Sequence, residues 1–186
     1  KNPLYSIDAT VISFCLSVFQ WSKFRKAKGA LKLHCQFDHS GQIPNFVVMT
    51  PGFKHETTVV KKIFTIIPDS IYCFDRAYTD FVLYRRITEE KAFFVTKAKK
   101  NLDYQVTGQH TETLKKGILS DEVIKVRNKS YNKALRLIRY YDDETGDIIT
   151  FLTNNFYLAP YTIVQIYQAR WDIEIFFRWI KQNLKI

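Results

Sequence analysis

The feature that most restricts the fold is an alternation, over the first hundred residues, of short β-prone runs with segments of helical periodicity. Residues 5–12, YSIDATVI, and residues 70–78, SIYCFDRAY, are both apolar and β-prone, and each contains one acid, Asp8 or Asp75. Such runs predict short buried strands. A carboxylate at the end of a buried strand is unfavourable without a partner, so both acids need an explanation.

The segments around these two runs complete the pattern. Residues 30–50 contain two β-prone runs separated by turn-forming residues at 38–41, which predicts a hairpin. Apolar residues recur at helical spacing over residues 56–67 and again over residues 79–90, which predicts two helices. Residues 91–99 are typical of another strand. The resulting order of strands and helices predicts an α/β fold in which helices cover a sheet.

The second half of the chain has a different pattern, with several β-prone runs separated by turns. The runs EVIKVRN, LRLIRYY and DIITFLTN are β-prone, and the last two are joined across DDETG, which predicts a β-rich insertion. Pro160 precedes a last helix that is expected to run from about residue 162 to the end. We therefore expect three parts: residues 1–100 form the first part of the core, 101–156 the insertion, and 157–186 the helix that completes the core.

Composition limits the class of protein. Of the 186 residues, 46% are hydrophobic and 16% aromatic, which is enough for the core of one globular domain. No run approaches the roughly 20 apolar residues of a membrane helix and no signal-peptide pattern is present, so a cytoplasmic protein is expected. Three cysteines without a C-x-x-C pair predict free thiols. Because the chain begins without methionine and stops inside a helical pattern, we interpret it as part of a longer protein.

The charge balance points to a polyanionic partner. The 28 Lys and Arg residues exceed the 18 Asp and Glu residues and give a formal charge of +10, which favours nucleic acid. In residues 19–32, FQWSKFRKAKGALK, cations that include Lys26 and Lys28 alternate with aromatic residues, a composition suited to a loop that contacts phosphates and stacks on bases. A solvated basic connector explains the same composition equally well.

The last helix carries the most specific pattern. Because successive helical residues turn by about 100°, Arg170, Glu174 and Lys181 lie within roughly 60° of arc of Tyr167. The apolar residues lie mostly on the other side and are expected to face the sheet: Ile173, Phe176, Trp179, Ile180 and Leu184. The charged stripe should then face out of the core. An ordinary solvated helix, in which Arg170 and Glu174 form an i to i+4 pair, is the alternative.

Three carboxylates are candidates for one site. Asp8 and Asp75 lie at the ends of predicted strands, and Glu174 is the helical acid that could meet them. Buried carboxylates usually have a cation between them. Ligands that are all oxygen atoms suit Mg²⁺ or Mn²⁺, and no cluster of His and Cys offers a zinc site. Two such ions about 4 Å apart can activate a water or hydroxyl and stabilise the leaving oxygen of a phosphodiester.

These motifs together resemble the DDE transposases of bacterial insertion sequences, in particular the subgroup with a Y-(2)-R-(3)-E-(6)-K signature. Four residues match this signature in full: Tyr167, Arg170, Glu174 and Lys181. The IDAT around Asp8, the KAKGALKLH that follows it and the FDRAY around Asp75 are similar to that family's first and second acidic motifs, in order. The resemblance implies a ribonuclease H-like mixed sheet flanked by helices, with a β-rich insertion before the last helix and with Asp8 and Asp75 on neighbouring strands.

The same resemblance implies a function. Asp8, Asp75 and Glu174 would be the catalytic residues and would bind two Mg²⁺ or Mn²⁺ ions, for hydrolysis at the transposon ends and for joining the 3′-hydroxyl to target DNA. The residues expected to contact double-stranded DNA are Tyr167, Arg170, Lys181 and Arg76, together with Lys26 and Lys28 of the basic segment. A homodimer in the synaptic complex, a bacterial cytoplasm close to the nucleoid and no membrane partner are also implied.

Two other functions stay open on the sequence. An inactive or truncated transposase copy would only bind DNA, and a metal-dependent nuclease of the same fold would cut DNA without joining ends. The presence of all three acids argues against decay by point mutation. The four-position signature favours transposition over the nuclease, but only through the family resemblance.

Overall fold

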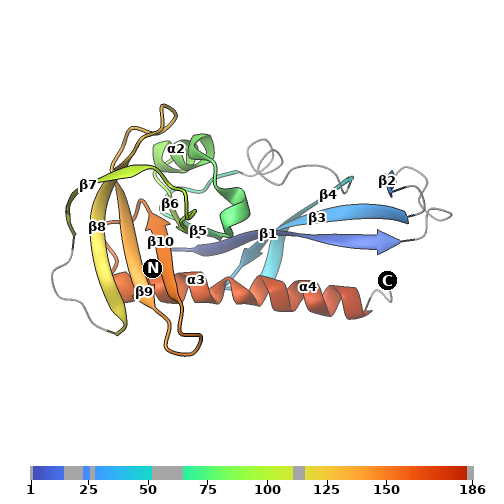
Figure 1. The fold of residues 1–186 in the computed structure, drawn as a ribbon. Coiled ribbons are helices and arrows are strands. Elements are labelled where there is room, and N and C mark those ends of the chain that lie inside the picture. The colour runs from blue at the N-terminus through green and yellow to red at the C-terminus, as the bar shows by residue number, and fades with distance from the viewer. Residues whose placement is uncertain (1, 15–22, 26–27, 52–64, 111–115, 184–186) are drawn as a thin grey trace.

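The computed structural model describes residues 2–14, 23–25, 28–51, 65–110 and 116–183 (Figure 1). The strands are β1 (Leu4–Phe14), β2 (Lys23–Arg25), β3 (Lys28–Asp38), β4 (Ile43–Pro51), β5 (Ile71–Phe74), β6 (Phe93–Lys97), β7 (Tyr104–Gln109), β8 (Ile118–Val126), β9 (Leu135–Tyr141) and β10 (Ile148–Thr153). The helices are the short 3₁₀ helix η1 (Arg76–Tyr78), α2 (Phe81–Glu89), α3 (Pro160–Ala169) and α4 (Trp171–Asn183). The prediction of a mixed α/β fold is confirmed.

All of these strands belong to one mixed sheet. Its order is β2-β3-β1-β5-β6-β10-β9-β8-β7, and β4 also pairs with β3. The predicted hairpin of β3 and β4 is confirmed, and β3 runs antiparallel to β1. β1, β5 and β6 are mutually parallel neighbours, so their carboxyl ends meet at the same edge of the sheet. All four residues of β5 are buried, which explains its uninterrupted apolar sequence.

The β-rich second half extends this same sheet. β10 pairs antiparallel with β6, and β9, β8 and β7 follow as an antiparallel series. The predicted β-rich character of residues 101–156 is therefore confirmed. The division of the chain at residues 100 and 156 stays a prediction.

Helices cover the sheet on both faces. Figure 1 shows α2 on one side and α3 and α4 end to end on the other. On the α2 side, Tyr84 stacks on Phe94 with ring centroids 4.3 Å apart, inside a core that also contains Phe74. On the other side, α3 packs over β5, β6 and β10, and α4 packs over β1 and β3. Alternating residues of the central strands supply the two cores.

Two of the predicted helices can be compared with the structure. The helix predicted for residues 79–90 is confirmed as α2, and Asp80 is its N-cap, accepting hydrogen bonds from the backbone N–H groups of Val82 and Leu83. The helix predicted for residues 56–67 falls mainly on residues outside the described part of the chain. Within that part, no helix is long and apolar enough to span a lipid bilayer.

The prediction of one continuous last helix is wrong. α3 begins at Pro160 and ends at Ala169, α4 begins at Trp171, and Arg170 lies between them. The backbone N–H of Arg170 donates to the carbonyl of Tyr167, and that of Ile173 donates to the carbonyl of Arg170. These are i to i−3 bonds, which tighten the turn and interrupt the α-helical pattern without reversing the chain.

The apolar face of α4 differs from the predicted one. Ile173 and Phe177 are buried, and Phe176 and Ile180 pack beside them. Trp179 is 60% exposed, although the helical pattern placed it on the buried face. The buried residues of α4 pack on β1 and β3, and Trp179 lies outside that contact. Leu184 lies outside the described residues.

The predicted free thiols are confirmed where the structure describes them. Cys35 and Cys73 are free and buried. Burial raises the pKa of each thiol to about 12, so both are unreactive at neutral pH. Cys15 lies outside the described residues.

Candidate functional site

The first two acids occupy adjacent positions at the carboxyl edge of the parallel strands. The last paired residues of β1 and β5 are Ile7 and Phe74, and Asp8 and Asp75 follow them directly. Asp75 ends its strand as predicted, and its carboxylate accepts the backbone N–H of Ala77 at 2.9 Å as the cap of η1. The expectation that Asp8 also ends a strand is wrong, because β1 continues to Phe14 through its pairing with β3. Asp8 instead lies where β1 loses its β5 neighbour.

Helix α4 brings the third acid to the same place. Its first turn is held on the sheet by Ile173, which is fully buried against residues of β1 and β3. Glu174 is the next residue and is half-buried. Arg170 connects the two elements: one terminal nitrogen donates to Asp8 at 3.2 Å and the other to Glu174 at 2.5 Å. The i to i+4 pair between Arg170 and Glu174 is therefore present, and it also includes Asp8.

The local electrostatics favour the protonated form of Asp8. Burial raises the pKa of Asp8 to about 6; the Ala9 backbone N–H and Arg170 oppose this rise, while Asp75 and Glu174 add to it. The side chain of Asp8 is 19% exposed. Arg170 thus contacts Asp8 and Glu174, while Asp75 acts on Asp8 through its charge.

The chemistry of these donors fits a hard divalent cation. All three side chains offer carboxylate oxygens, the ligands that Mg²⁺ and Mn²⁺ prefer. Within the described residues, no group of three or more His, Cys, Asp or Glu side chains stands arranged around one point as a cation site. The guanidinium of Arg170 bridges Asp8 and Glu174 and supplies the positive charge between them.

Beside these acids lies a cavity of about 370 Å³ with a basic rim. Asp8 and Glu174 line it together with Arg178 and Lys181, and both cations are exposed. The predicted position of Lys181 next to the acids is therefore found in the structure. Arg178 is not among the residues predicted from the sequence, although it lies one helical turn after Glu174 and extends the charged stripe by that turn.

Tyr167 lies in the core. It is 8% exposed and packs on Phe151 with ring centroids 5.1 Å apart. Lys97 and Arg170 lie 5.1 and 5.5 Å from the centroid of its ring, and burial raises the pKa of its hydroxyl to about 12. The expectation that all four signature residues face out of the core is therefore wrong for Tyr167, because α3 lies directly over the sheet at this residue.

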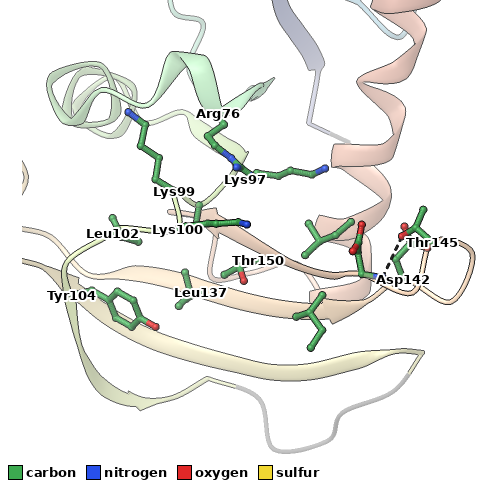
Figure 2. A pocket seen from close by; sticks show the side chains of 14 residues that line it. Arg76, Lys97, Lys99, Lys100, Leu102, Tyr104, Leu137, Asp142, Thr145 and Thr150 are labelled. Atoms are coloured by element: carbon green, nitrogen blue, oxygen red, sulfur yellow. Dashed lines mark hydrogen bonds between the residues drawn. The ribbon is translucent and has the colours of Figure 1, made fainter.

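A second, larger cavity continues the basic surface along the same edge of the sheet. It measures about 470 Å³, and four cations line it: Arg76, Lys97, Lys99 and Lys100. Figure 2 shows these side chains together, with Asp142 and Thr145 at the β9–β10 turn. Lys97 and Asp142 also line the hollow that contains Tyr167 and Arg170, so the basic surface runs toward the acids. We call this surface the basic groove.

The sequence reasoning found Arg76 but missed the three lysines of the basic groove. Their signal is the run TKAKK, residues 96–100, which begins at the end of β6. Because β6 is parallel to β1 and β5, its carboxyl end lies at the same edge as Asp8 and Asp75. Of the other predicted cations, Lys28 is the first residue of β3 and Lys26 lies outside the described residues.

These features define the class of the protein. It is an α/β domain in which Asp8 and Asp75 follow neighbouring parallel strands, Glu174 lies near Asp8, and a groove lined by cations lies at the same edge. The chain belongs to the family described as Transposase DDE domain, which matches residues 1–186.

Curated relatives agree with this membership. The chain is 30% identical over 172 residues to y4zB of Sinorhizobium fredii, whose name describes a transposase, and the match covers 89% of this chain and 48% of that protein. It is 26% identical over 188 residues to a Geobacillus stearothermophilus protein named as a transposase for insertion sequence element IS5377, covering 100% of this chain and 49% of that protein. The chain spans about half the length of the curated relatives it matches.

Proposed function

We propose that this chain is the catalytic domain of a transposase that cuts DNA at transposon ends and joins the 3′-hydroxyl end to target DNA. The observation that supports the proposal is the position of Asp8 and Asp75 at one edge of the sheet, with Glu174 close enough to raise the pKa of Asp8 together with Asp75. Membership of the DDE transposase family and similarity to proteins named as transposases support it.

We further propose that the fold is ribonuclease H-like and that the chain belongs to the subgroup with the Y-(2)-R-(3)-E-(6)-K signature. The strand order β4-β3-β1-β5-β6, antiparallel up to β1 and parallel beyond it, supports the first statement. The spacing of Tyr167, Arg170, Glu174 and Lys181 supports the second.

Asp8, Asp75 and Glu174 would hold Mg²⁺ or Mn²⁺. When bound, such ions lower the pKa of a water or hydroxyl and stabilise charge on the phosphate oxygens. The chain's own contribution is to bind and orient DNA beside the acids. Arg170 compensates Asp8 and Glu174 when no other cation is present. Lys181 would approach a DNA phosphate from the exposed rim of the same cavity.

The basic groove is the proposed path of the DNA backbone. Arg76 directly follows Asp75, and Lys97, Lys99 and Lys100 continue the positive surface along the edge of the sheet. A phosphate backbone in this groove would pass next to the acids. The net charge of +10 adds a sequence-independent attraction for DNA. The functional unit would be a homodimer that holds two transposon ends on the bacterial chromosome.

The experiment is a single-turnover assay with Mg²⁺, a labelled transposon end and a target duplex, using the full-length protein. Glu174→Gln should lower cleavage by roughly 1,000-fold or more, equivalent to about 4 kcal/mol of transition-state stabilisation. Its DNA affinity should stay within about twofold, because the glutamine keeps the size of the side chain and adds no phosphate contact. The exposed Glu90→Gln is the matched control.

Each outcome separates the proposed function from its rivals. Joined product from the wild-type protein supports the transposase. Cut DNA without joined product would indicate a metal-dependent nuclease instead. DNA binding without either product would indicate an inactive copy, and cleavage by Glu174→Gln would contradict the role of the three acids.

A further inference from the structure

A second polar cluster lies beside the acids and contains none of them. Nε2 of His39 lies 2.7 Å from the hydroxyl oxygen of Ser6, and Nδ1 of His39 lies 3.2 Å from a carboxylate oxygen of Asp172. Ser6 is in β1, His39 in the β3–β4 turn and Asp172 in the first turn of α4. The ring of His39 therefore connects the strand that carries Asp8 to the helix that carries Glu174.

The order serine, histidine, aspartate is also that of a hydrolytic triad, but burial excludes that function. Ser6 has no exposed surface, and the side chain of His39 is 10% exposed. A nucleophile must reach its substrate, and Ser6 cannot. The cluster therefore has a structural role, and the elements that it connects indicate what that role is.

Hydrogen-bond chemistry fixes how the three side chains interact. An ionised carboxylate only accepts, so Nδ1 of His39 carries the proton and donates to Asp172. Nε2 then accepts the hydroxyl proton of Ser6. Burial lowers the pKa of His39 against the opposing effect of Asp172, in agreement with a neutral ring. Both ring nitrogens are used, so a change of His39 breaks both links.

His39 is itself held firmly. Its backbone N–H donates to the carbonyl of Leu4 at 3.1 Å, which ties the β3–β4 turn to the start of β1. Its ring meets Phe37 edge-on, with centroids 5.4 Å apart. The imidazole is therefore a fixed point on the sheet, against which α4 can be aligned.

The cluster runs beside the contact made by Arg170. Ser6 and Asp8 are two residues apart on β1, so they point to the same face of the sheet. Arg170 and Asp172 are two residues apart where α4 begins, and Arg170 donates to Asp8 while Asp172 accepts from His39. The start of α4 is thus linked to β1 twice: Arg170 binds Asp8 directly, and Asp172 reaches Ser6 through His39.

The apolar contacts of α4 cannot fix its position equally well. Ile173 and Phe177 attract the helix to the sheet, but hydrophobic contact has no preferred direction and allows sliding. Hydrogen bonds depend on distance and angle and so select one alignment. A displacement of 1 Å is enough to disturb a site that acts by geometry.

We propose that His39 is a positioning residue that sets where the first turn of α4 lies over β1, and thereby sets the separation of Glu174 from Asp8. The inference rests on the proposed function of the three acids for its catalytic meaning. The alignment itself is a property of the fold and can be measured separately.

The test compares four full-length proteins: wild type, His39→Phe, Asp172→Ala and Asp172→Asn. Phenylalanine keeps the size of the ring and its contact with Phe37 but removes both hydrogen bonds. Asparagine still accepts from Nδ1 through its amide oxygen, so Asp172→Asn should behave like the wild type. Gln182→Ala, at an exposed position of α4, is the matched control.

Two readouts are needed. Hydrogen exchange should speed up about tenfold in residues 170–175 of His39→Phe and Asp172→Ala, while α2 is unchanged. Mn²⁺ affinity, measured by electron paramagnetic resonance titration, should fall about three- to tenfold in the same two variants. Asp172→Asn should retain the wild-type values of both.

The outcomes distinguish this inference from the proposed function. Unchanged exchange in residues 170–175 of His39→Phe would overturn the positioning role, whatever the protein catalyses. Equal loss in Asp172→Asn and Asp172→Ala would also overturn it, because charge rather than alignment would then be responsible. If Glu174→Gln does not lower Mn²⁺ affinity, the three-acid site is wrong, and the exchange data alone decide whether His39 aligns α4.

Discussion

Two arginines of this protein bind aspartates in different ways. Arg136 and Asp121 are both fully buried, and two nitrogens of Arg136 donate to the two carboxylate oxygens of Asp121 at 2.6 and 2.7 Å. Arg170 divides its guanidinium between Asp8 and Glu174. The buried Nε of Arg170 has no hydrogen-bond partner among the described residues.

This difference in hydrogen bonding distinguishes a pair that stabilises the fold from the residues of the candidate functional site. The remaining nitrogen of Arg136 donates to the carbonyls of Asn155 and Leu158, so the pair also anchors the segment that leads into α3. One arginine balances one aspartate, and Nε and both terminal nitrogens of Arg136 donate hydrogen bonds. At the acid edge, Arg170 is shared by two carboxylates, Asp8 and Glu174, and both are partly exposed. The partly exposed acids remain accessible to a ligand, whereas the complete buried pair holds the fold.

The largest expected change in the free energy of unfolding is at the buried pair of Arg136 and Asp121. Asp121→Asn leaves the fully buried Arg136 without its anion, and we expect the free energy of unfolding to fall by about 3 kcal/mol or more. Urea unfolding at pH 7 measures this change. The matched control is Asp103→Asn, which removes an exposed pair with Arg127 and should cost less than about 1 kcal/mol. Equal effects of the two substitutions would show that burial of Asp121 is not what matters.

Replacing Asp8 by Asn should instead raise the free energy of unfolding. Asp8 holds its proton up to a pH of about 6, above the usual value for aspartate of about 3.9. The folded state therefore binds more protons than the unfolded state between these values, and stability is lost as the pH rises through this window. Asp8→Asn removes that loss and should raise the free energy of unfolding by roughly 1 to 3 kcal/mol at pH 7.

The measurement is urea unfolding of Asp8→Asn and wild type from pH 3.5 to pH 7.5, in a chelator. The two proteins should be equally stable near pH 3.5 and separate as the pH rises above 4. A constant difference at every pH would mean that Asp8 does not titrate in this window. If Asp8→Asn is less stable than the wild type at pH 7, Asp8 stabilises the fold, as Asp121 does.

The smallest effect concerns the groove beside the acids. Lys99→Ala and Lys100→Ala each remove one exposed cation that lines the basic groove. Each change should lower the slope of log Kd for DNA against log salt by about 1, because about one phosphate contact is lost. Fluorescence anisotropy over a range of salt concentrations measures this. Lys133→Ala, an exposed lysine outside the groove, should leave the slope unchanged, and an equal effect there would indicate only a general basic surface.

Local patterns predicted much of this molecule. The alternation of short apolar runs predicted β1, β5 and β6, and helical spacing predicted α2. The pattern failed at Arg170, where two i to i−3 bonds separate α3 from α4, and at Trp179, which is exposed. Helical periodicity places residues around a helix, but the interruption at Arg170 and the residues that α4 buries depend on how each helix packs on the sheet.

What the sequence determined by itself is the chemistry: which residues are acids, which are cations, and how the signature residues are spaced along the chain. What only the tertiary structure decided is which of them meet. Asp8 and Arg170 are 162 positions apart in the sequence and are in contact. The contacts of His39 with Ser6 and Asp172, and the closeness of Lys97 to Asp75, arise in the same way. Periodicity reports forces between residues a few positions apart, whereas the packing of helices on the sheet selects the distant contacts.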